Sequence, residues 1–186
     1  TKIPYLISYK IPEKWSDWLV YQHKTPRDTL LKKAKKLSKK TGYELNIQNL
    51  IDTAHYKYPF VKEYILSKKG GKIAFTSSGD DGEFQSGVYV FDTQKQSIQS
   101  IYVSKGIFKS LKWDEAGQQL SFVSDLDTTQ SLNRYFNLHL WSIGDDTAKT
   151  ILTARDEFLE KTYLISEHTP LSFSKNGSLL YFGKSL

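Results

Sequence analysis

The chain has 186 residues, of which 39% are hydrophobic, 14% aromatic and 25% charged, and it contains no cysteine. This composition excludes a disordered chain, a collagen, a small disulfide-linked domain and any site built on cysteine thiolates. The formal net charge of +6 comes from one segment: six of the 26 basic residues lie within nine positions without an acid, and the remaining 20 match the 20 acidic residues. The six are Lys32, Lys33, Lys35, Lys36, Lys39 and Lys40.

The first predicted elements in chain order are two strands, which are followed by a basic insertion at residues 26–42. Pro26 and Asp28 form a helix start, Gly42 supplies a stop, and apolar residues recur between them at three- and four-residue steps. We therefore expect one short inserted helix. Clustered lysines can attract the phosphates of nucleic acid or anionic lipid. No aromatic residue or arginine lies between these lysines, however, so we expect a solvated insertion and no nucleic-acid partner.

Three later segments share one spacing, in which a small polar residue precedes a Gly by three positions and a Phe by eight. Alternating apolar positions on both sides are typical of a strand, a tight turn and a second strand. The polar side chain can bond the turn backbone, and the Gly accepts the positive φ that such turns require. A degenerate earlier copy has Glu13, Ser16 and Tyr21 at the matching positions. The structural repeat residues are Ser67, Gly70 and Phe75; Asp114, Gly117 and Phe122; and Ser174, Gly177 and Phe182.

Short alternating strands are predicted between these copies, at residues 45–47, 88–90 and 138–140, each followed by turn residues and a further strand. Two hairpins therefore repeat in order, and equivalent positions are 54, 47 and 60 residues apart. Four antiparallel strands in ~40–50 residues are typical of a β-propeller blade. We predict a first blade at 1–58 with the insertion at 26–42, a second at 59–106, a third at 107–169 and the start of a fourth at 170–186.

The predicted fold class is thus all-β, a partial β-propeller of about three and a half blades with one short inserted helix. A sandwich is the alternative, but evenly spaced sandwich strands do not predict the same polar–Gly–Phe register at each interval. Because propellers usually close with ~4–8 blades, we expect a fragment of a longer chain. A ring completed by a second copy of the chain is the other possibility.

The opening segment at residues 7–21, ISYKIPEKWSDWLVY, resembles a segment of large prolyl oligopeptidase-like serine peptidases from Bacteroidetes-type bacteria. The lysine-rich insertion, the strand GVYVFD at 87–92 and the ending LSFSKNGSLLYFG at 171–183 are also similar to those proteins. The blade motifs by themselves also fit TolB-like and WD-repeat-like propellers.

The resemblance implies an exported, periplasmic parent enzyme in which a propeller covers a C-terminal α/β-hydrolase domain and restricts the access of peptide substrates. The nucleophile elbow of such a domain needs G-x-S-x-G, which is absent from this sequence, so no catalytic residue is assigned. We expect a non-catalytic segment that helps to recognise peptides. The alternative is a free-standing TolB-like module for protein interactions. No apolar run reaches the ~18–20 residues that would span a membrane.

No cofactor and no metal site are predicted. The four histidines form neither H-E-x-x-H nor H-x-H, and His139 is expected to find a side-chain partner within the sheet. Acidic clusters at 80–83, 125–127 and 145–146 lack the twelve-residue calcium loop and are expected to be turns. Residues 177–185 resemble a phosphate loop, but five residues separate the two glycines and form an apolar strand. The other histidines are His23, His55 and His168.

Overall fold

The computed structural model describes residues 3–15, 17–24, 41–80, 82, 84–127, 129, 134–159 and 163–185. Within these ranges every regular element is a β-strand, in agreement with the predicted all-β class. The predicted inserted helix falls on residues 26–42, of which 26–40 lie outside the described residues, so it stays a prediction. None of the described segments forms a helix long and apolar enough to cross a membrane.

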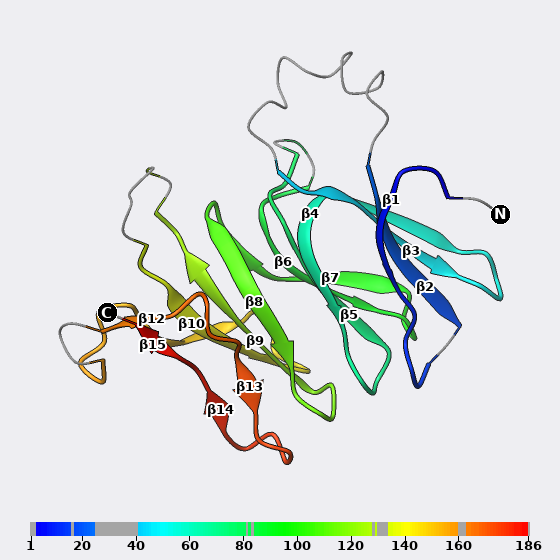
Figure 1. Cartoon of the computed structure of the whole chain (residues 1–186). Helices are drawn as coiled ribbons and strands as arrows, with labels where there is room; N and C mark the ends of the chain where they lie inside the picture. Colours follow the sequence, from blue (N-terminus) through cyan, green and yellow to red (C-terminus); the bar gives the residue numbers. More distant parts are fainter. Residues whose placement is uncertain are drawn as a thin grey trace.

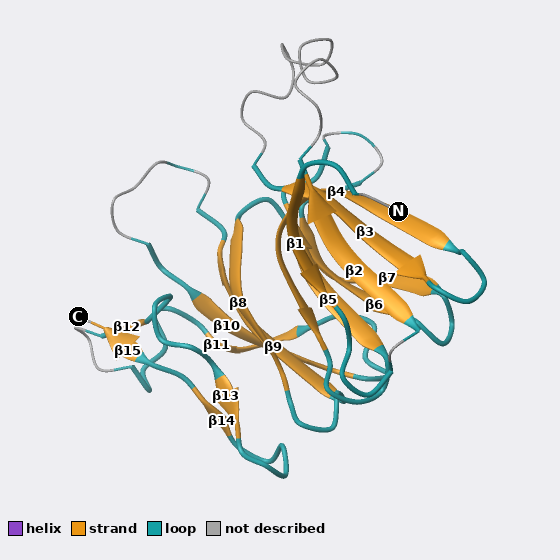
Figure 2. Cartoon of the chain, turned by 45° about the vertical axis from the view of Figure 1, so that its right-hand side comes forward, coloured by secondary structure: helices purple, strands orange, loops and turns teal. Residues whose placement is uncertain are grey.

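Two antiparallel sheets and two short strand pairs make up the described fold, and in both sheets each strand pairs with its neighbour in sequence (Figures 1 and 2). The first sheet contains β1 (Leu6–Lys10), β2 (Trp18–His23), β3 (Tyr43–Asn49), β4 (His55–Leu66), β5 (Lys72–Ser77), β6 (Gly87–Asp92) and β7 (Ser97–Val103). The second contains β8 (Ile107–Trp113), β9 (Gln119–Asp125), β10 (Asn137–Ser142) and β11 (Lys149–Leu152). The pairs are β12 (Leu164–Ile165) with β15 (Lys184–Ser185), and β13 (Ser172–Phe173) with β14 (Leu180–Tyr181).

The long strand β4 joins the two halves of the seven-stranded sheet. Its first part pairs with β3 and its second part with β5, and both pairings shift register next to Val61. Phe60 has a φ of 51°, and the preceding Pro59 has no N–H to donate to a ladder, which favours a local bend. The predicted boundary between residues 58 and 59 lies at this bend, and the division of the chain into blades stays a prediction.

The core consists of three apolar clusters stacked across the faces of the sheets. Strand β5 is buried along its whole length because its two faces contact different clusters. Ile73 and Phe75 belong to the first cluster, which they share with β2 and β3, whereas Ala74 belongs to the second, which it shares with β8 and β9. A third cluster packs β9 and β10 against the C-terminal strands. The sequences of the middle strands are therefore nearly continuous apolar runs, because both faces of these strands are covered.

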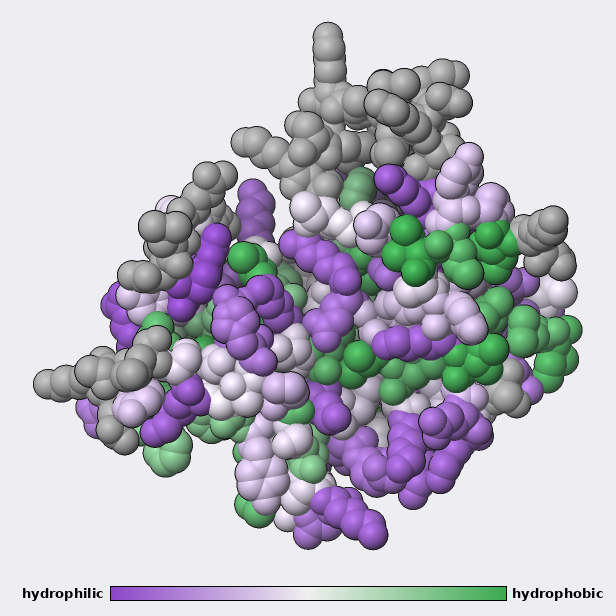
Figure 3. Space-filling model, viewed as in Figure 1, coloured by the Kyte–Doolittle hydropathy of each residue, from purple (hydrophilic) through white to green (hydrophobic). Residues whose placement is uncertain are grey.

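Strand β1 differs, because it and its flanking residues carry exposed apolar side chains that we call the β1 apolar row. Ile7 and Tyr9 lie on β1, Tyr5 and Ile11 flank it, and the four side chains are 45%, 62%, 65% and 55% exposed, in that order. Figure 3 shows hydrophobic side chains gathered over these N-terminal strands. An apolar row of this kind is a common sign of a missing packing partner.

Candidate functional site

The three copies of the structural repeat form turns with the same hydrogen bonds. In each copy the small polar side chain accepts the backbone N–H five residues later. The Gly three residues later has a φ of 69° to 81°, a region that L-residues with a side chain rarely adopt. The pairs of acceptor and donor are Ser67 with Lys72, Asp114 with Gln119, and Ser174 with Leu179. These turns connect β4 to β5, β8 to β9 and β13 to β14.

Successive turns also contact one another at one end of the sheets. A Cβ on Gly117 would overlap the carbonyl oxygen of Lys69 and lie 3.1 Å from the Ser67 Cβ, so the second turn packs closely on the first. The third turn lies on the second in the same way, since Gln119 Nε2 donates to the carbonyl oxygen of Gly177 at 3.1 Å. The glycines of the repeat thus permit close approach between turns as well as the positive φ.

The phenylalanines of the repeat lie in the core behind these turns. Phe75 and Phe122 are fully buried in the first and second clusters, and Phe182 is half-buried against the third. In the degenerate copy, Trp15 Nε1 donates to the carbonyl oxygen of Ser67 at 3.0 Å, while Ser16 lies outside the described residues. This bond places the loop between β1 and β2 against the first turn.

The turns and the strands that lead into them surround a cavity of about 920 Å³, which we call the inner groove. Its walls come from the ends of β1, β4, β8 and β13, the first strand of each hairpin. This volume lies in the range of ligand-binding clefts. Among the residues that line the inner groove are Lys10, Leu66, Leu111, Lys112, Trp113 and Phe173.

Polar side chains link three of the groove-lining strands across the gaps between them, β1 with β4 and β4 with β8. Lys10 Nζ donates to the carbonyl oxygen of Tyr64 at 2.9 Å, and it also lies 4.7 Å from the centre of the Tyr64 ring. The carboxylate of Glu63 accepts the backbone N–H of Leu111 at 3.0 Å. Burial raises the pKa of Glu63, although its hydrogen bonds with the backbone of β8 favour the charged form. Each of these contacts joins strands that share no ladder.

We expect Glu63→Ala to lower the free energy of unfolding by about 1–3 kcal/mol, because it leaves the backbone N–H of Leu111 without an acceptor. Glu63→Gln retains an oxygen acceptor and should cost much less. Urea denaturation of the two variants measures the difference, and equal losses would contradict a role for the hydrogen bond.

The raised pKa of Glu63 also predicts how the folding stability changes with pH. Because the pKa of Glu63 is raised in the folded state, its stabilising contribution is complete below the ordinary pKa and is lost as the pH rises through the folded-state pKa. The wild type should therefore lose stability relative to Glu63→Gln as the pH rises above the ordinary carboxyl pKa.

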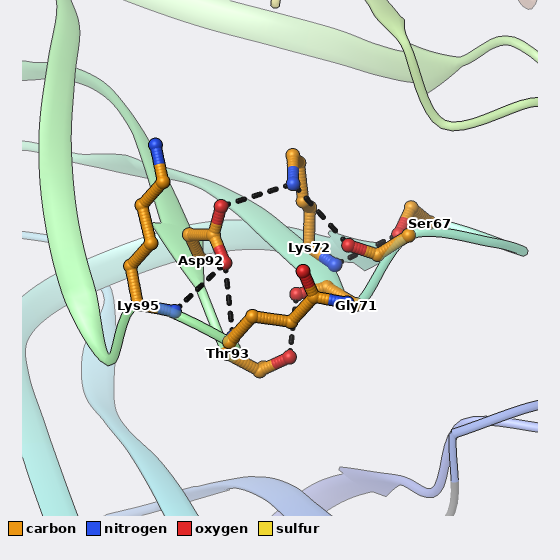
Figure 4. Close-up of polar contacts among 8 residues, drawn as sticks. Ser67, Gly71, Lys72, Asp92, Thr93 and Lys95 are labelled. Carbon is orange, nitrogen blue, oxygen red and sulfur yellow. Dashed lines mark hydrogen bonds and ion pairs between the residues drawn. The ribbon is translucent and has the colours of Figure 1, made fainter.

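A buried ion pair lies beside the first turn (Figure 4). Lys72 Nζ donates to Asp92 Oδ2 at 3.0 Å and to the carbonyl oxygen of Gly70 at 3.2 Å. Thr93 Oγ1 donates to the carbonyl oxygen of Gly71 at 2.7 Å, which fixes the turn from the other side. Burial opposes ionisation of Asp92, but the hydrogen bonds from Lys72 and from two backbone N–H groups lower its pKa overall.

His139 has the side-chain partners that the sequence analysis expected. Its Nε2 lies 2.7 Å from Ser124 Oγ, its Nδ1 lies 3.2 Å from Thr150 Oγ1, and its ring stacks on Phe122. A serine next to a histidine can form a nucleophile–base pair, but both residues are fully buried here, so a substrate cannot reach them. Burial lowers the pKa of His139 to about 4. The group is therefore a structural one.

We expect acid to destabilise the chain through His139. A depressed folded-state pKa means that the contribution is present above the ordinary pKa and is lost as the pH falls toward 4. Between pH 7 and pH 5 the loss should amount to about 2 kcal/mol. His139→Gln should remove this part of the pH dependence in urea denaturation, and identical pH profiles would contradict the assignment.

Two further histidines, distant in sequence, meet at one buried amide. Asn46 Nδ2 lies 2.9 Å from His23 Nδ1, and Asn46 Oδ1 lies 2.8 Å from His55 Nε2. Glu44 Oε1 lies 3.5 Å from His23 Nε2. His168 is 87% exposed and lies 4.0 Å from Glu167. The side-chain amide of Asn46 is therefore hydrogen-bonded to one ring nitrogen of His23 and to one ring nitrogen of His55.

The acidic clusters are used by turns and ion pairs. Asp80 Oδ1 accepts two backbone N–H groups, Asp125 pairs with Arg134 at 3.2 Å, and Asp145 pairs with Lys149 at 3.2 Å. Asp81 and Glu83 lie outside the described residues. Over the ranges that the structure covers, no three His, Asp or Glu side chains are grouped as metal ligands would be.

No protein-family model matches the chain, and no curated protein matches it significantly. Three solved structures with similar folds are an acylaminoacyl peptidase from Pyrococcus horikoshii (TM-score 0.50, 16% identity), the tricorn protease (0.56, 11%) and a protein from a study of two prolyl endopeptidases (0.52, 14%). The matches cover 79%, 98% and 96% of this chain, in that order, and lie in β-propeller regions. The fold is propeller-like.

The chain spans only 25%, 16% and 26% of the lengths of these three proteins, in the same order. At such low identities the likeness establishes the fold and leaves the activity open. The repeated polar–Gly–Phe spacing pointed to this fold without any of these structures. The contacts made by Lys10, Glu63 and Lys72 were missed, since a single lysine or glutamate in a strand carries no signal of a partner far away in the sequence.

Proposed function

We propose that this chain is a non-catalytic propeller segment of an exported serine peptidase similar to the prolyl oligopeptidases of Bacteroidetes-type bacteria. In this proposal it restricts the access of peptides to an α/β-hydrolase domain of the same protein and helps to recognise them. The observation that carries the proposal is the inner groove, which is lined by the first strand of each hairpin. Strands in that position surround the central passage of a propeller, and its width limits what can pass.

The β1 apolar row supports the part of the proposal that concerns a longer protein. Its four side chains are large and apolar, yet they are 45% to 65% exposed. A further blade packed on this face would bury them as the other blade faces are buried. Each such side chain contributes about 1.5–3 kcal/mol when it is fully buried, so a covered face is strongly favoured.

Labelling with a fluorophosphonate probe tests the proposal on the full-length gene product. We expect a covalent adduct on a serine within G-x-S-x-G, outside residues 1–186, and no adduct on the 186-residue chain alone. If the full gene product contains no such motif before its stop codon and takes up no probe, the peptidase proposal fails and a free-standing interaction module replaces it.

Light scattering on the purified 186-residue chain tests a ring formed by two copies. A monomer contradicts the two-copy ring. A stable dimer that the Tyr9→Lys substitution in the β1 apolar row dissociates would support the two-copy ring and would argue against a further blade on that face.

A further inference from the structure

Strands β2, β3 and β4 lie side by side in the first sheet (Figure 1), and the side-chain amide of Asn46 lies between polar groups of all three. Leu45 and Ile47 belong to the first cluster, so Asn46 between them lies on the opposite face of β3. Asn46 is only 1% exposed. Its amide must therefore find its hydrogen-bond partners among neighbouring side chains rather than in water.

The two partners of this amide are histidines on different strands. Asn46 Nδ2 lies 2.9 Å from His23 Nδ1 on β2, and Asn46 Oδ1 lies 2.8 Å from His55 Nε2 on β4. A side-chain amide has one accepting oxygen and one donating NH2 group, and the two point in different directions. The ring that faces the NH2 group must therefore present a bare nitrogen, and the ring that faces the oxygen must present an N–H.

This arrangement limits how many protons the two histidines can hold. A positively charged imidazole carries an N–H on both of its nitrogens and accepts no hydrogen bond. The single oxygen of Asn46 can accept from one such ring only. Turning the amide over exchanges the roles of His23 and His55 and leaves the limit unchanged. Both hydrogen bonds can therefore exist only while at least one ring is neutral.

Three titratable side chains face the pair from the same strands. Glu44 Oε1 lies 3.5 Å from His23 Nε2, and the ring of Tyr21 lies 6.3 Å from both imidazole rings. Lys57 lies opposite Asn46 in the register of β3 with β4. Burial lowers the pKa of His55, the positive charges of Lys57 and His23 lower it further, and Glu44 partly opposes them.

Charged groups on the adjoining elements are engaged elsewhere. On β1, Leu6 lies opposite His23, and Lys10 donates to a carbonyl oxygen of β4. In the turn before β4, Asp52 accepts a hydrogen bond from the turn between β6 and β7 and another from its own turn backbone. Proton binding by the two histidines therefore depends on the shared amide and on the three side chains that face it.

We propose that Asn46 is a proton-dependent link between β2 and β4, which holds both histidines while at most one ring is charged and releases one of them when both are charged. The second proton then binds more weakly than the first, because it must break a hydrogen bond. The contact is lost next to Tyr21, which lies opposite Tyr9 of the β1 apolar row. Acid should therefore alter the face that carries this row, whether or not the chain belongs to a peptidase.

An NMR titration of the histidine rings in the 186-residue chain tests the proposal, with His23→Gln and His55→Gln variants to assign the signals. We expect the second proton to bind about tenfold to a hundredfold more weakly than the first. The NH2 protons of Asn46 should exchange faster with solvent only as the second proton binds.

The Asn46→Asp variant supplies two accepting oxygens, so both rings can be charged at once and the two protons should bind within about threefold of each other. Asn49→Asp is the matched control, because it makes the same change on β3 at a side chain that accepts the backbone N–H of Ile51. This variant should keep the wild-type separation between the two protons.

Equal affinities for the two protons in the wild type overturn the proposal. A separation that persists in Asn46→Asp overturns it in favour of simple repulsion between the charged rings. Salt provides a second test that needs no variant, since about 1 M NaCl screens such repulsion and should leave the effect of the hydrogen bond in place. A separation that disappears in salt overturns the proposal as well.

Discussion

Replacing Gly117 with alanine is expected to lower the free energy of unfolding by about 3–5 kcal/mol. Gly117 has a φ of 69°, so an alanine there is strained even in open space. Its Cβ would also overlap the carbonyl oxygen of Lys69, a backbone atom that cannot rotate away. The substitution must therefore separate the first and second turns. Urea or thermal denaturation followed by circular dichroism measures the loss.

Gly144 provides the matched control for this substitution. Its φ is 96°, but a Cβ there would meet no other atom within 4 Å. The Gly144→Ala variant should therefore show only the backbone strain, about 1–2 kcal/mol. If both variants lose the same stability, contact between the turns contributes nothing and the cost comes from φ alone.

The second large effect is expected at the ion pair of Lys72 and Asp92. Their side chains are 11% and 18% exposed, and Asp92→Ala leaves the ammonium group of Lys72 with only the carbonyl oxygen of Gly70. Removing one partner of a buried pair typically costs about 3–5 kcal/mol, and we expect a value near the lower limit because both groups keep some contact with water. Asp92 also accepts the backbone N–H groups of Gln94 and Lys95, which the alanine variant loses as well.

The double variant Lys72→Met/Asp92→Leu distinguishes the stability lost with the charge pair from the stability lost with side-chain packing. Because it removes both charges, it should recover part of the stability that Asp92→Ala loses. The pH profile gives a second check. The pKa of Asp92 is lowered, so the contribution of the pair is present above the ordinary pKa and should disappear as the pH falls through the folded-state value. A double variant as unstable as the single one would contradict this account.

The local elements of the fold were predictable because their signals lie within a few residues. The alternation at 45–47, 88–90 and 138–140 predicted strands that the structure places in β3, β6 and β10. The side-chain partners of His139 followed from its place between two leucines. The bend in β4 was not predicted, since it depends on which strands pair on either side of Val61.

The polar links depend on contacts between residues far apart in sequence. Glu63 reaches Leu111 only after two sheets have packed together, and Asp92 lies beside Lys72 only in the register of β5 with β6. Nothing in either segment alone specifies such a partner. The inner groove shares this origin, because four strands from distant segments form its walls.

Because the turns pack on one another at one end of the strands, the two ends of the strands should differ in how well they tolerate insertions. At the end where the turns meet, the connections at 67–71 and 114–118 have the same length, and an inserted residue in either would lift its glycine from the neighbouring turn. At the opposite end of the strands the connections at 24–42, 78–86 and 126–136 contain 19, 9 and 11 residues. New segments can therefore be added at that end without disturbing the contacts between turns. A reporter domain or affinity tag placed between Thr129 and Arg134 should leave the fold intact, whereas the same addition within 114–118 should not.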